Sequence, residues 1–253
     1  MSAPSRTKEF WLDALRREGA AFRAAVDAAQ FDAPVPPCPG WTVRDLVGHL
    51  GAVYRWQRAN LLRGVTTAPE GARPGPPAVG DQELLAWWDE AYAEMVGSME
   101  RIDPDSPAWN WSVQPHKAIF WHRRMAHETA IHRWDAQVSS TGLSEPIEHN
   151  LAADGIDEVL DSWLPAGRGT GPSHRTGVVR LEATDAEARW ALRIRVNGVT
   201  LLDTDSWFDD EPEAQAAAIG TASDLDLALW GRVPLTVLTL QGDPELVNAL
   251  RVG

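Results

Sequence analysis

Cysteine is almost absent from this chain of 253 residues, since Cys38 is the only one. A single cysteine excludes an internal disulfide framework and is typical of a reducing compartment. Long apolar runs are also lacking, because no stretch approaches the roughly 18 uninterrupted apolar residues of a membrane-spanning helix. The first 17 residues are polar and charged, without the apolar segment of a secretory signal. We therefore expect a cytoplasmic protein with no membrane partner.

Basic residues are scarce as well, with 23 Lys and Arg against 36 Asp and Glu and a formal net charge of −13. No basic run offsets this charge, so the composition argues against a nucleic-acid partner. Tyrosine is rare and tryptophan abundant, 2 against 13, which we interpret as core and rim packing. The length allows one large or two modest domains, and the sequence leaves the oligomeric state open.

The first part of the chain has the apolar spacing of amphipathic helices, over residues 7–30, 43–62, 81–99 and 120–136. Thr42 and Asp81 are predicted to cap the second and the third helix. The stretches 64–80 and 103–115, rich in loop-forming residues, separate these helices. We predict an up-and-down bundle of four helices with two long connections.

The pattern changes at residues 165–172, which contain three Gly and two Pro. Before this stretch, Asn150 is predicted to cap a further helix that extends to Leu164. After it, strands are predicted over residues 178–183, 190–196, 199–203, 216–222 and 235–241, with Asn197-Gly198 as a hairpin turn and Ser223 as the cap of a short helix. The fold class is therefore α+β, with a helical domain over 1–164, a linker over 165–172 and a small α+β domain over 173–253.

Glu128 and His132 lie four residues apart on the predicted fourth helix, so both side chains point to one face. A carboxylate and an imidazole at this spacing are candidate metal ligands, although the pair differs from the zincin motif, which has His at both ends of the step. His127 lies about 140° around the helix from His132 and cannot easily share an ion with it. The other interpretation is a hydrogen-bonded surface pair.

His49 borders the apolar face of the second helix and is either a buried, hydrogen-bonded histidine or a third ligand. With Glu128 and His132 it would make a site of two histidines and one carboxylate, which leaves a coordination position open. Arg124, one turn before Glu128, either pairs with that carboxylate or binds an anionic substrate group.

Three further features allow more than one interpretation. Trp109-Asn110-Trp111 either lines a pocket or packs against the bundle. Cys38 is a rival nucleophile that lacks a His or Lys neighbour in sequence, so we discount it. Asp135 and Arg133 are expected to hold the fourth helix to its neighbours, and Asp135 is also considered as a hydrogen-bond partner of a ligand imidazole.

Three blocks occur in a familiar order: Cys38-Pro-Gly-Trp-Thr-Val-Arg-Asp-Leu-Val-Gly-His49-Leu, then His127-Glu-x-x-x-His132-Arg-Trp-Asp135-Ala, then Ala222-Ser-Asp-Leu-x-Leu-x-Leu-Trp-Gly-Arg232 with Gln241-Gly-Asp243. Together they resemble the mycothiol-dependent maleylpyruvate isomerase family of actinobacteria. The resemblance implies a DinB-like four-helix bundle followed by a sterol-carrier-like domain. It implies a divalent metal, zinc in the isomerase, held by His49, Glu128 and His132, with Arg232 contributing to activity.

The resemblance also implies mycothiol as the thiol cosubstrate and a small electrophile as its target. A thiolate that adds to a cis double bond beside a carbonyl allows rotation and elimination to the trans isomer. The same attack on another electrophile ends as a thioether, which makes the protein an S-transferase. The alternative is a non-catalytic protein of the same fold that binds a metal or a small ligand. Similarity of fold does not identify the substrate.

Overall fold

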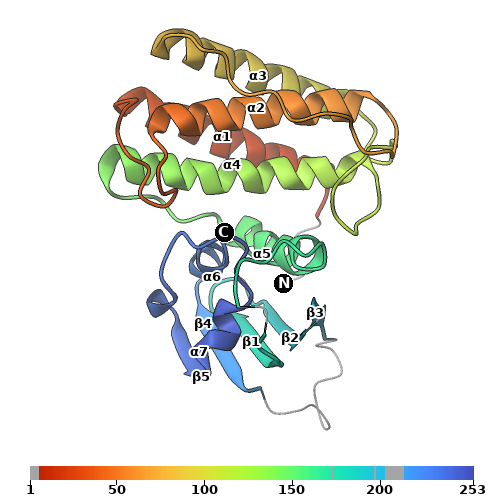
Figure 1. The fold of residues 1–253 in the computed structure, drawn as a ribbon, viewed down its shortest axis with the longest axis vertical. Helices are drawn as coiled ribbons and strands as arrows, with labels where there is room; N and C mark the ends of the chain where they lie inside the picture. Colours follow the sequence, from red (N-terminus) through yellow and green to blue (C-terminus); the bar gives the residue numbers. More distant parts are fainter. Residues whose placement is uncertain (1–5, 173, 197, 203–213) are drawn as a thin grey trace. The chain divides into compact units, whose positions relative to one another are not determined.

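The computed structural model describes residues 6–172, 174–196, 198–202 and 214–253. The chain divides into two compact units, Met1–Glu145 and Pro146–Gly253. The first is helical and the second contains a mixed sheet with helices (Figure 1), so the predicted α+β class is confirmed. Among the described residues, none of the helices is both long and apolar enough to cross a membrane.

The first unit consists of four long helices, α1 (Lys8–Ala28), α2 (Val43–Leu62), α3 (Asp81–Arg101) and α4 (Ala118–Thr141). Thr42 caps α2 as predicted, because its hydroxyl accepts from the Asp45 amide while the Asp45 carboxylate accepts from the Thr42 amide. The predicted cap of α3 is wrong by one residue. Gly80 is the cap, and its amide donates to Glu83, so Asp81 is left free to pair with Arg44.

Ion pairs along α2 and α3 show that these two helices run parallel, because Arg44, Arg55 and Arg58 pair in turn with Asp81, Glu90 and Glu94. α4 runs opposite to α2, since His49 lies beside Glu128 and Trp56 beside Trp121. The strict up-and-down alternation expected from the sequence is therefore wrong. Parallel neighbours require a crossover, and the connection between α2 and α3 provides it.

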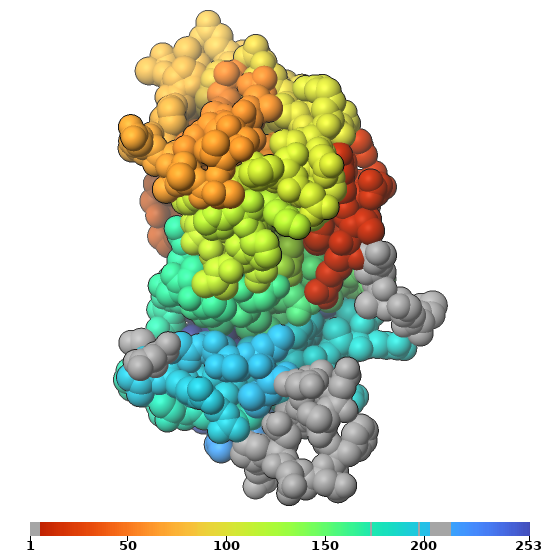
Figure 2. Space-filling model, turned by 90° about the vertical axis from the view of Figure 1, so that its right-hand side faces the viewer, coloured from red at the N-terminus to blue at the C-terminus, as the bar shows by residue number. Residues whose placement is uncertain are grey.

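Close approach of α2 and α3 depends on Gly51, where an added Cβ would come 2.3 Å from the Trp87 ring. A buried ion pair joins α1 to α4, with Glu18 Oε2 2.7 Å from Arg133 Nε. This contact agrees with the expectation that Arg133 holds the fourth helix to a neighbour. At one end of the bundle the Trp109 amide donates to the Val65 carbonyl. The orange and yellow-green surfaces that carry these two segments lie against each other in Figure 2.

The second unit begins with α5 (His149–Glu158), which continues into a π-helical turn (Val159–Trp163). Its cap is Glu148, whose carboxylate accepts from the Leu151 amide, so the predicted cap at Asn150 is wrong. The cap of α6 (Ala222–Leu229) is Thr221, which accepts from the Asp224 amide, in place of the predicted Ser223. The Ser223 hydroxyl instead accepts from the Ile147 amide.

Five strands form the sheet: β1 (Gly177–Ala183), β2 (Arg189–Arg195), β3 (Gly198–Leu201), β4 (Ala216–Gly220) and β5 (Thr239–Gly242). Their order is β3-β2-β1-β4-β5, with β1 and β4 parallel and the other neighbours antiparallel. The pairing of β2 with β3 confirms the predicted hairpin, although residue 197 of its turn lies outside the described residues. A 3-10 turn (Leu235–Val237) occupies the first half of the segment predicted as the last strand.

The last helix, α7 (Pro244–Asn248), starts with Pro at its first position, where the missing N–H costs no helical hydrogen bond. α6 packs on β1 and β4, and α5 packs against α6. The contact of α5 with α6 is close, since a Cβ on Gly155 would come 2.7 Å from the Asp226 carboxylate. α5 therefore groups with the sheet, whereas the sequence analysis grouped it with the bundle up to residue 164.

Candidate metal centre

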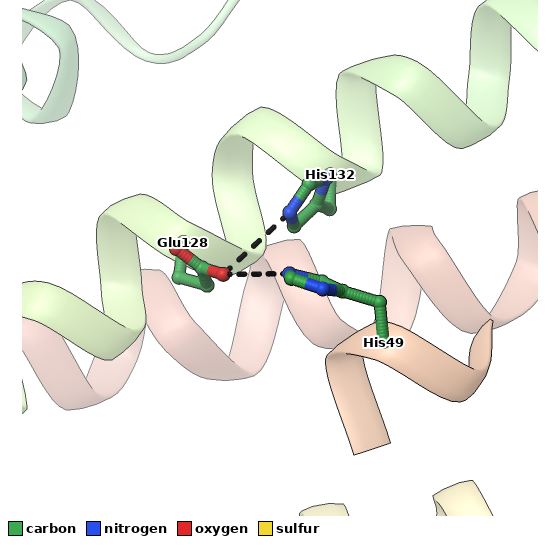
Figure 3. A group of neighbouring side chains, drawn as sticks. All are labelled: His49, Glu128 and His132. Carbon is green, nitrogen blue, oxygen red and sulfur yellow. Dashed lines mark hydrogen bonds and ion pairs between the residues drawn. The ribbon is translucent and has the colours of Figure 1, made fainter. Parts of the chain in front are cut away.

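His49, Glu128 and His132 converge on one point in the first unit (Figure 3). Glu128 and His132 extend from neighbouring turns of α4, and His49 reaches them from α2. Glu128 Oε1 lies 3.2 Å from His49 Nε2 and 3.5 Å from His132 Nε2. The spacing of the pair on α4 brings its two side chains together, and the antiparallel packing of α2 adds the third.

The three side chains offer a donor set that suits a divalent cation. One ligand atom from each lies within 4.8 Å of the others. An ion bound to nitrogen and oxygen donors at about 2.0–2.2 Å needs them about this close. Two imidazoles and one carboxylate are common ligands of zinc and of non-haem iron, and both sites keep a position open. The residues present therefore fit a metal centre.

Asp135 fixes the orientation of His132. Its Oδ2 lies 2.9 Å from His132 Nδ1, and the Asp135 side chain is fully buried. With a metal bound, this contact would hold the ring proton on Nδ1 and leave the lone pair of Nε2 for the ion. The contact is the hydrogen bond to an imidazole that the sequence offered as the second of two roles for Asp135. The separation of three residues from His132 to Asp135 was the signal.

Arg124 pairs with Glu128, as one of the two interpretations of the sequence proposed. Its Nη2 lies 2.9 Å from Glu128 Oε2, and its side chain is 3 % exposed. The guanidinium therefore occupies one carboxylate oxygen and leaves Oε1 for the site. Its predicted catalytic role stays a prediction.

Opposite effects set the ionisation of the three groups. Burial raises the pKa of Glu128, but hydrogen bonds from His132 and His49 and the charge of Arg124 outweigh it, so the pKa falls well below its usual range. For His49, burial disfavours the charged imidazolium and lowers the pKa, so the ring is neutral. For His132 the burial penalty is outweighed by Asp135 and Glu128, and its pKa is raised. Glu128 is thus ionised and His49 neutral near pH 7.

Trp41 covers both imidazoles from one side. Its ring centroid lies 4.8 Å from that of His49 and 6.3 Å from that of His132. Beyond Trp41 and His49 lies an open pocket of about 590 Å³, which the segment 73–77 also lines. The site is therefore bordered, at Trp41 and His49, by a space that can take a small molecule.

The remaining candidates lie outside the trio. His127 is buried on α4, away from the trio's ligand atoms. Cys38 Sγ lies 3.5 Å from Asp135 Oδ2, so the thiol contacts the residue behind His132 rather than the site itself. Arg232 belongs to the second unit, where its Nη1 donates to the Trp230 carbonyl. Its predicted part in activity stays a prediction.

Trp109 and Trp111 pack against other rings of the bundle. Trp109 meets Trp56 at a centroid distance of 5.9 Å, and Trp111 meets Phe120 at 5.6 Å. Between them Asn110 is buried and closes the loop through bonds to the Ser112 amide and the Pro115 carbonyl. These contacts favour the packing interpretation of this segment over a pocket wall.

Comparisons with known proteins agree with this arrangement. Residues 12–137, which hold the whole trio, match the family described as the mycothiol maleylpyruvate isomerase N-terminal domain. The fold is similar to a crystal structure of a histidine-to-alanine mutant of the mycothiol-dependent maleylpyruvate isomerase, at 13 % identity and a TM-score of 0.60. It is also similar to a crystal structure of the mycothiol-dependent maleylpyruvate isomerase, at 14 % and 0.58. Each likeness covers 93 % of both chains. No curated protein matches the sequence.

Proposed function

This chain belongs to the mycothiol-dependent maleylpyruvate isomerase family, and from that membership we propose that it is a metal-dependent enzyme that directs a small thiol onto a small electrophile. The metal is proposed to be zinc, held by His49, Glu128 and His132, and the thiol mycothiol. The observation that carries the proposal is the convergence of three ligand atoms beside an open pocket.

A divalent cation at such a site lowers the pKa of a thiol that enters its open position. The protein supplies the rest. Arg124 keeps Glu128 ionised and turned to the site, and Asp135 holds Nε2 of His132 toward the same point. Trp41 packs against the two rings and limits their movement. Together these groups hold a preformed binding site, which does not have to reorganise during the reaction.

Two reactions fit the site. In the first, the thiolate adds to a cis double bond conjugated with a carbonyl, so a C–S bond forms and the π bond breaks. Rotation about the new single bond and loss of the thiolate then restore the double bond in the trans geometry. In the second, the thiolate displaces a leaving group or opens an epoxide, and the thioether is the product. We propose the isomerisation of a maleylpyruvate-like substrate first, because the family match covers the candidate site and two crystal structures of the mycothiol-dependent maleylpyruvate isomerase share the fold.

The metal is tested by the content of purified protein. We expect about one equivalent of zinc in the wild type and loss of it in His49→Ala, because the remaining two ligands bind a cation weakly. Asp135→Asn should keep the fold and weaken zinc binding by about 10- to 100-fold, the usual effect of removing a partner of a ligand histidine. His149→Ala, at a half-exposed histidine of the second unit, is the control.

The reaction is tested with mycothiol and maleylpyruvate, by following the absorbance of the isomer and by searching for a thioether mass. Isomerisation that needs both zinc and mycothiol supports the first reaction, and a thioether supports the second. An unchanged zinc content in His49→Ala would remove the trio from consideration. A zinc protein whose reactions never depend on a thiol would instead favour a bound water as the nucleophile.

A further inference from the structure

Arg73 is a cationic side chain that lines the pocket beside His49. Arg44, Asp45 and Arg73 are the charged side chains that line it apart from the site itself. Arg44 is held by Asp81 and by the Val79 carbonyl, and Asp45 is bound in the cap of α2. Within the part of the chain that the structure describes, no carboxylate pairs with Arg73. Its positive charge is therefore available in a protein whose net charge is −13.

The backbone after Arg73 is held at the pocket. Four residues follow it as Pro74-Gly75-Pro76-Pro77, and each proline restricts its own φ. Pro76 packs on α2 so closely that a Cβ on Gly48 would come 2.9 Å from its ring. The bond from Arg44 to the Val79 carbonyl, 3.0 Å long, holds the end of the segment. The guanidinium is thus carried by an anchored segment.

The contact of Arg73 with His49 depends on the position of the ring proton. Arg73 Nη2 lies 3.5 Å from His49 Nδ1, and a guanidinium can only donate, so Nδ1 must accept. When Nε2 of His49 binds a cation, the ring proton resides on Nδ1, and two donors then face each other. When a metal is bound, the Arg73 guanidinium therefore no longer donates to His49. Its N–H groups are then available beside the open pocket.

We propose that Arg73 determines substrate specificity by binding a carboxylate of the electrophile. A guanidinium binds a carboxylate through two parallel hydrogen bonds, which fixes direction as well as charge. The substrate class is then a small conjugated acid whose carboxylate lies near the double bond that the thiol attacks. This inference rests on the proposed function, because it concerns the substrate of the same site.

The test is calorimetric titration with maleate, a small cis-dicarboxylate, and with its uncharged diamide. We expect Arg73→Ala to weaken maleate binding about tenfold, the loss of one charge-assisted pair, and to leave the diamide unchanged. Arg73→Lys should recover part of the affinity, because charge remains while the two-pronged geometry is lost. Arg63→Ala is the matched control, since Arg63 belongs to the same connection but donates to Thr67 outside the pocket.

The zinc content of each variant is measured alongside, so that the two proposals can fail separately. Equal maleate affinity in the wild type and Arg73→Ala, at equal zinc content, would overturn the role of Arg73 and leave the metal site standing. An equal loss in Arg63→Ala would overturn it too, because general attraction would then explain the binding. If the wild type holds no zinc and Arg73→Ala still binds maleate more weakly than the wild type does, the proposed metal site is refuted and the proposed anion site is retained.

Discussion

Three histidines of the first unit show how burial and hydrogen-bond partners give the same side chain different roles. His49 and His132 face a carboxylate and one another, and each keeps a ring nitrogen directed at the site. His122, on the same helix as His132, is fully buried and meets only carbonyl oxygens, with Nδ1 2.9 Å from Ala118 and Nε2 3.0 Å from Met99. Both ring nitrogens thus face backbone carbonyls in the packed bundle, and the ring joins α3 to α4.

The stability of the protein should depend on pH through His122. Burial lowers the pKa of His122 and outweighs the two carbonyl oxygens that oppose it. The unfolded chain, with an ordinary histidine pKa near 6.5, then takes up the proton more readily than the folded protein. Above about pH 6.5 the ring is therefore neutral in both states and does not lower the free energy of unfolding. Below that pH the free energy of unfolding decreases progressively.

Urea unfolding at pH 5.5 and pH 7.5, with a chelator present, measures this effect. His122→Gln should be less stable than the wild type at pH 7.5, by about 1–2 kcal/mol for the altered buried hydrogen bonds. The difference between the two proteins should shrink at pH 5.5. His149→Gln should follow the wild type at both values. A constant difference across the pH range would show that His122 does not titrate during unfolding.

At the level of helices, the parallel pair α2 and α3 brings the candidate metal ligand His49 and the pocket together. α2 carries His49, and the crossover to α3 carries Arg73 and the prolines that line the pocket. The crossover passes along α2 because two parallel neighbours start at the same end of the bundle. A short turn between antiparallel helices would place no chain beside His49.

The close contact of α2 with α3 predicts a clear difference between two glycines in helices. Gly51→Ala should destabilise the protein by about 1–3 kcal/mol, because its Cβ would meet the rigid Trp87 ring at 2.3 Å. Gly97→Ala should be neutral or stabilising by up to about 1 kcal/mol, since its Cβ would meet only the mobile end of Arg101, at 3.2 Å. Thermal unfolding of both variants measures the difference. Equal changes in the melting temperature of Gly51→Ala and Gly97→Ala would contradict the close packing of α2 on α3.

At the level of the whole molecule, all three candidate ligands lie in one unit, whereas Arg232 lies in the other. A protein limited to residues 1–145 should therefore retain about one equivalent of zinc. If Arg232 contributes to the chemistry, as the family resemblance implies, this fragment should show no thiol-dependent isomerisation.

The full-length variant Arg232→Ala provides the comparison, with zinc content and activity measured on the same samples. Retained zinc with activity reduced by about two orders of magnitude, as for an arginine that stabilises developing charge, would support the role of Arg232. Full activity in Arg232→Ala would show that Arg232 does not contribute to the reaction. A folded fragment 1–145 without zinc would show instead that the metal needs the second unit.

The sequence determined those features that depend on local spacing. The helices of the bundle, the cap at Thr42, the β2–β3 hairpin and the pairing of Glu128 with His132 all follow from residues a few positions apart. Caps were less predictable when two polar residues competed nearby, as at Glu148 and Asn150, because the choice depends on backbone geometry. The third candidate ligand, His49, followed from the sequence only as one of two interpretations and from the resemblance to a family.

Tertiary structure alone decided what surrounds the site. Trp41 over both rings and Arg73 at the pocket come from other segments than α4, and no periodicity in the chain predicts that they meet the site. The parallel course of α2 and α3 is of the same kind, since a long loop permits either direction. Helical spacing reports which residues share a face of one helix, whereas the contact between faces depends on the packing of the whole bundle.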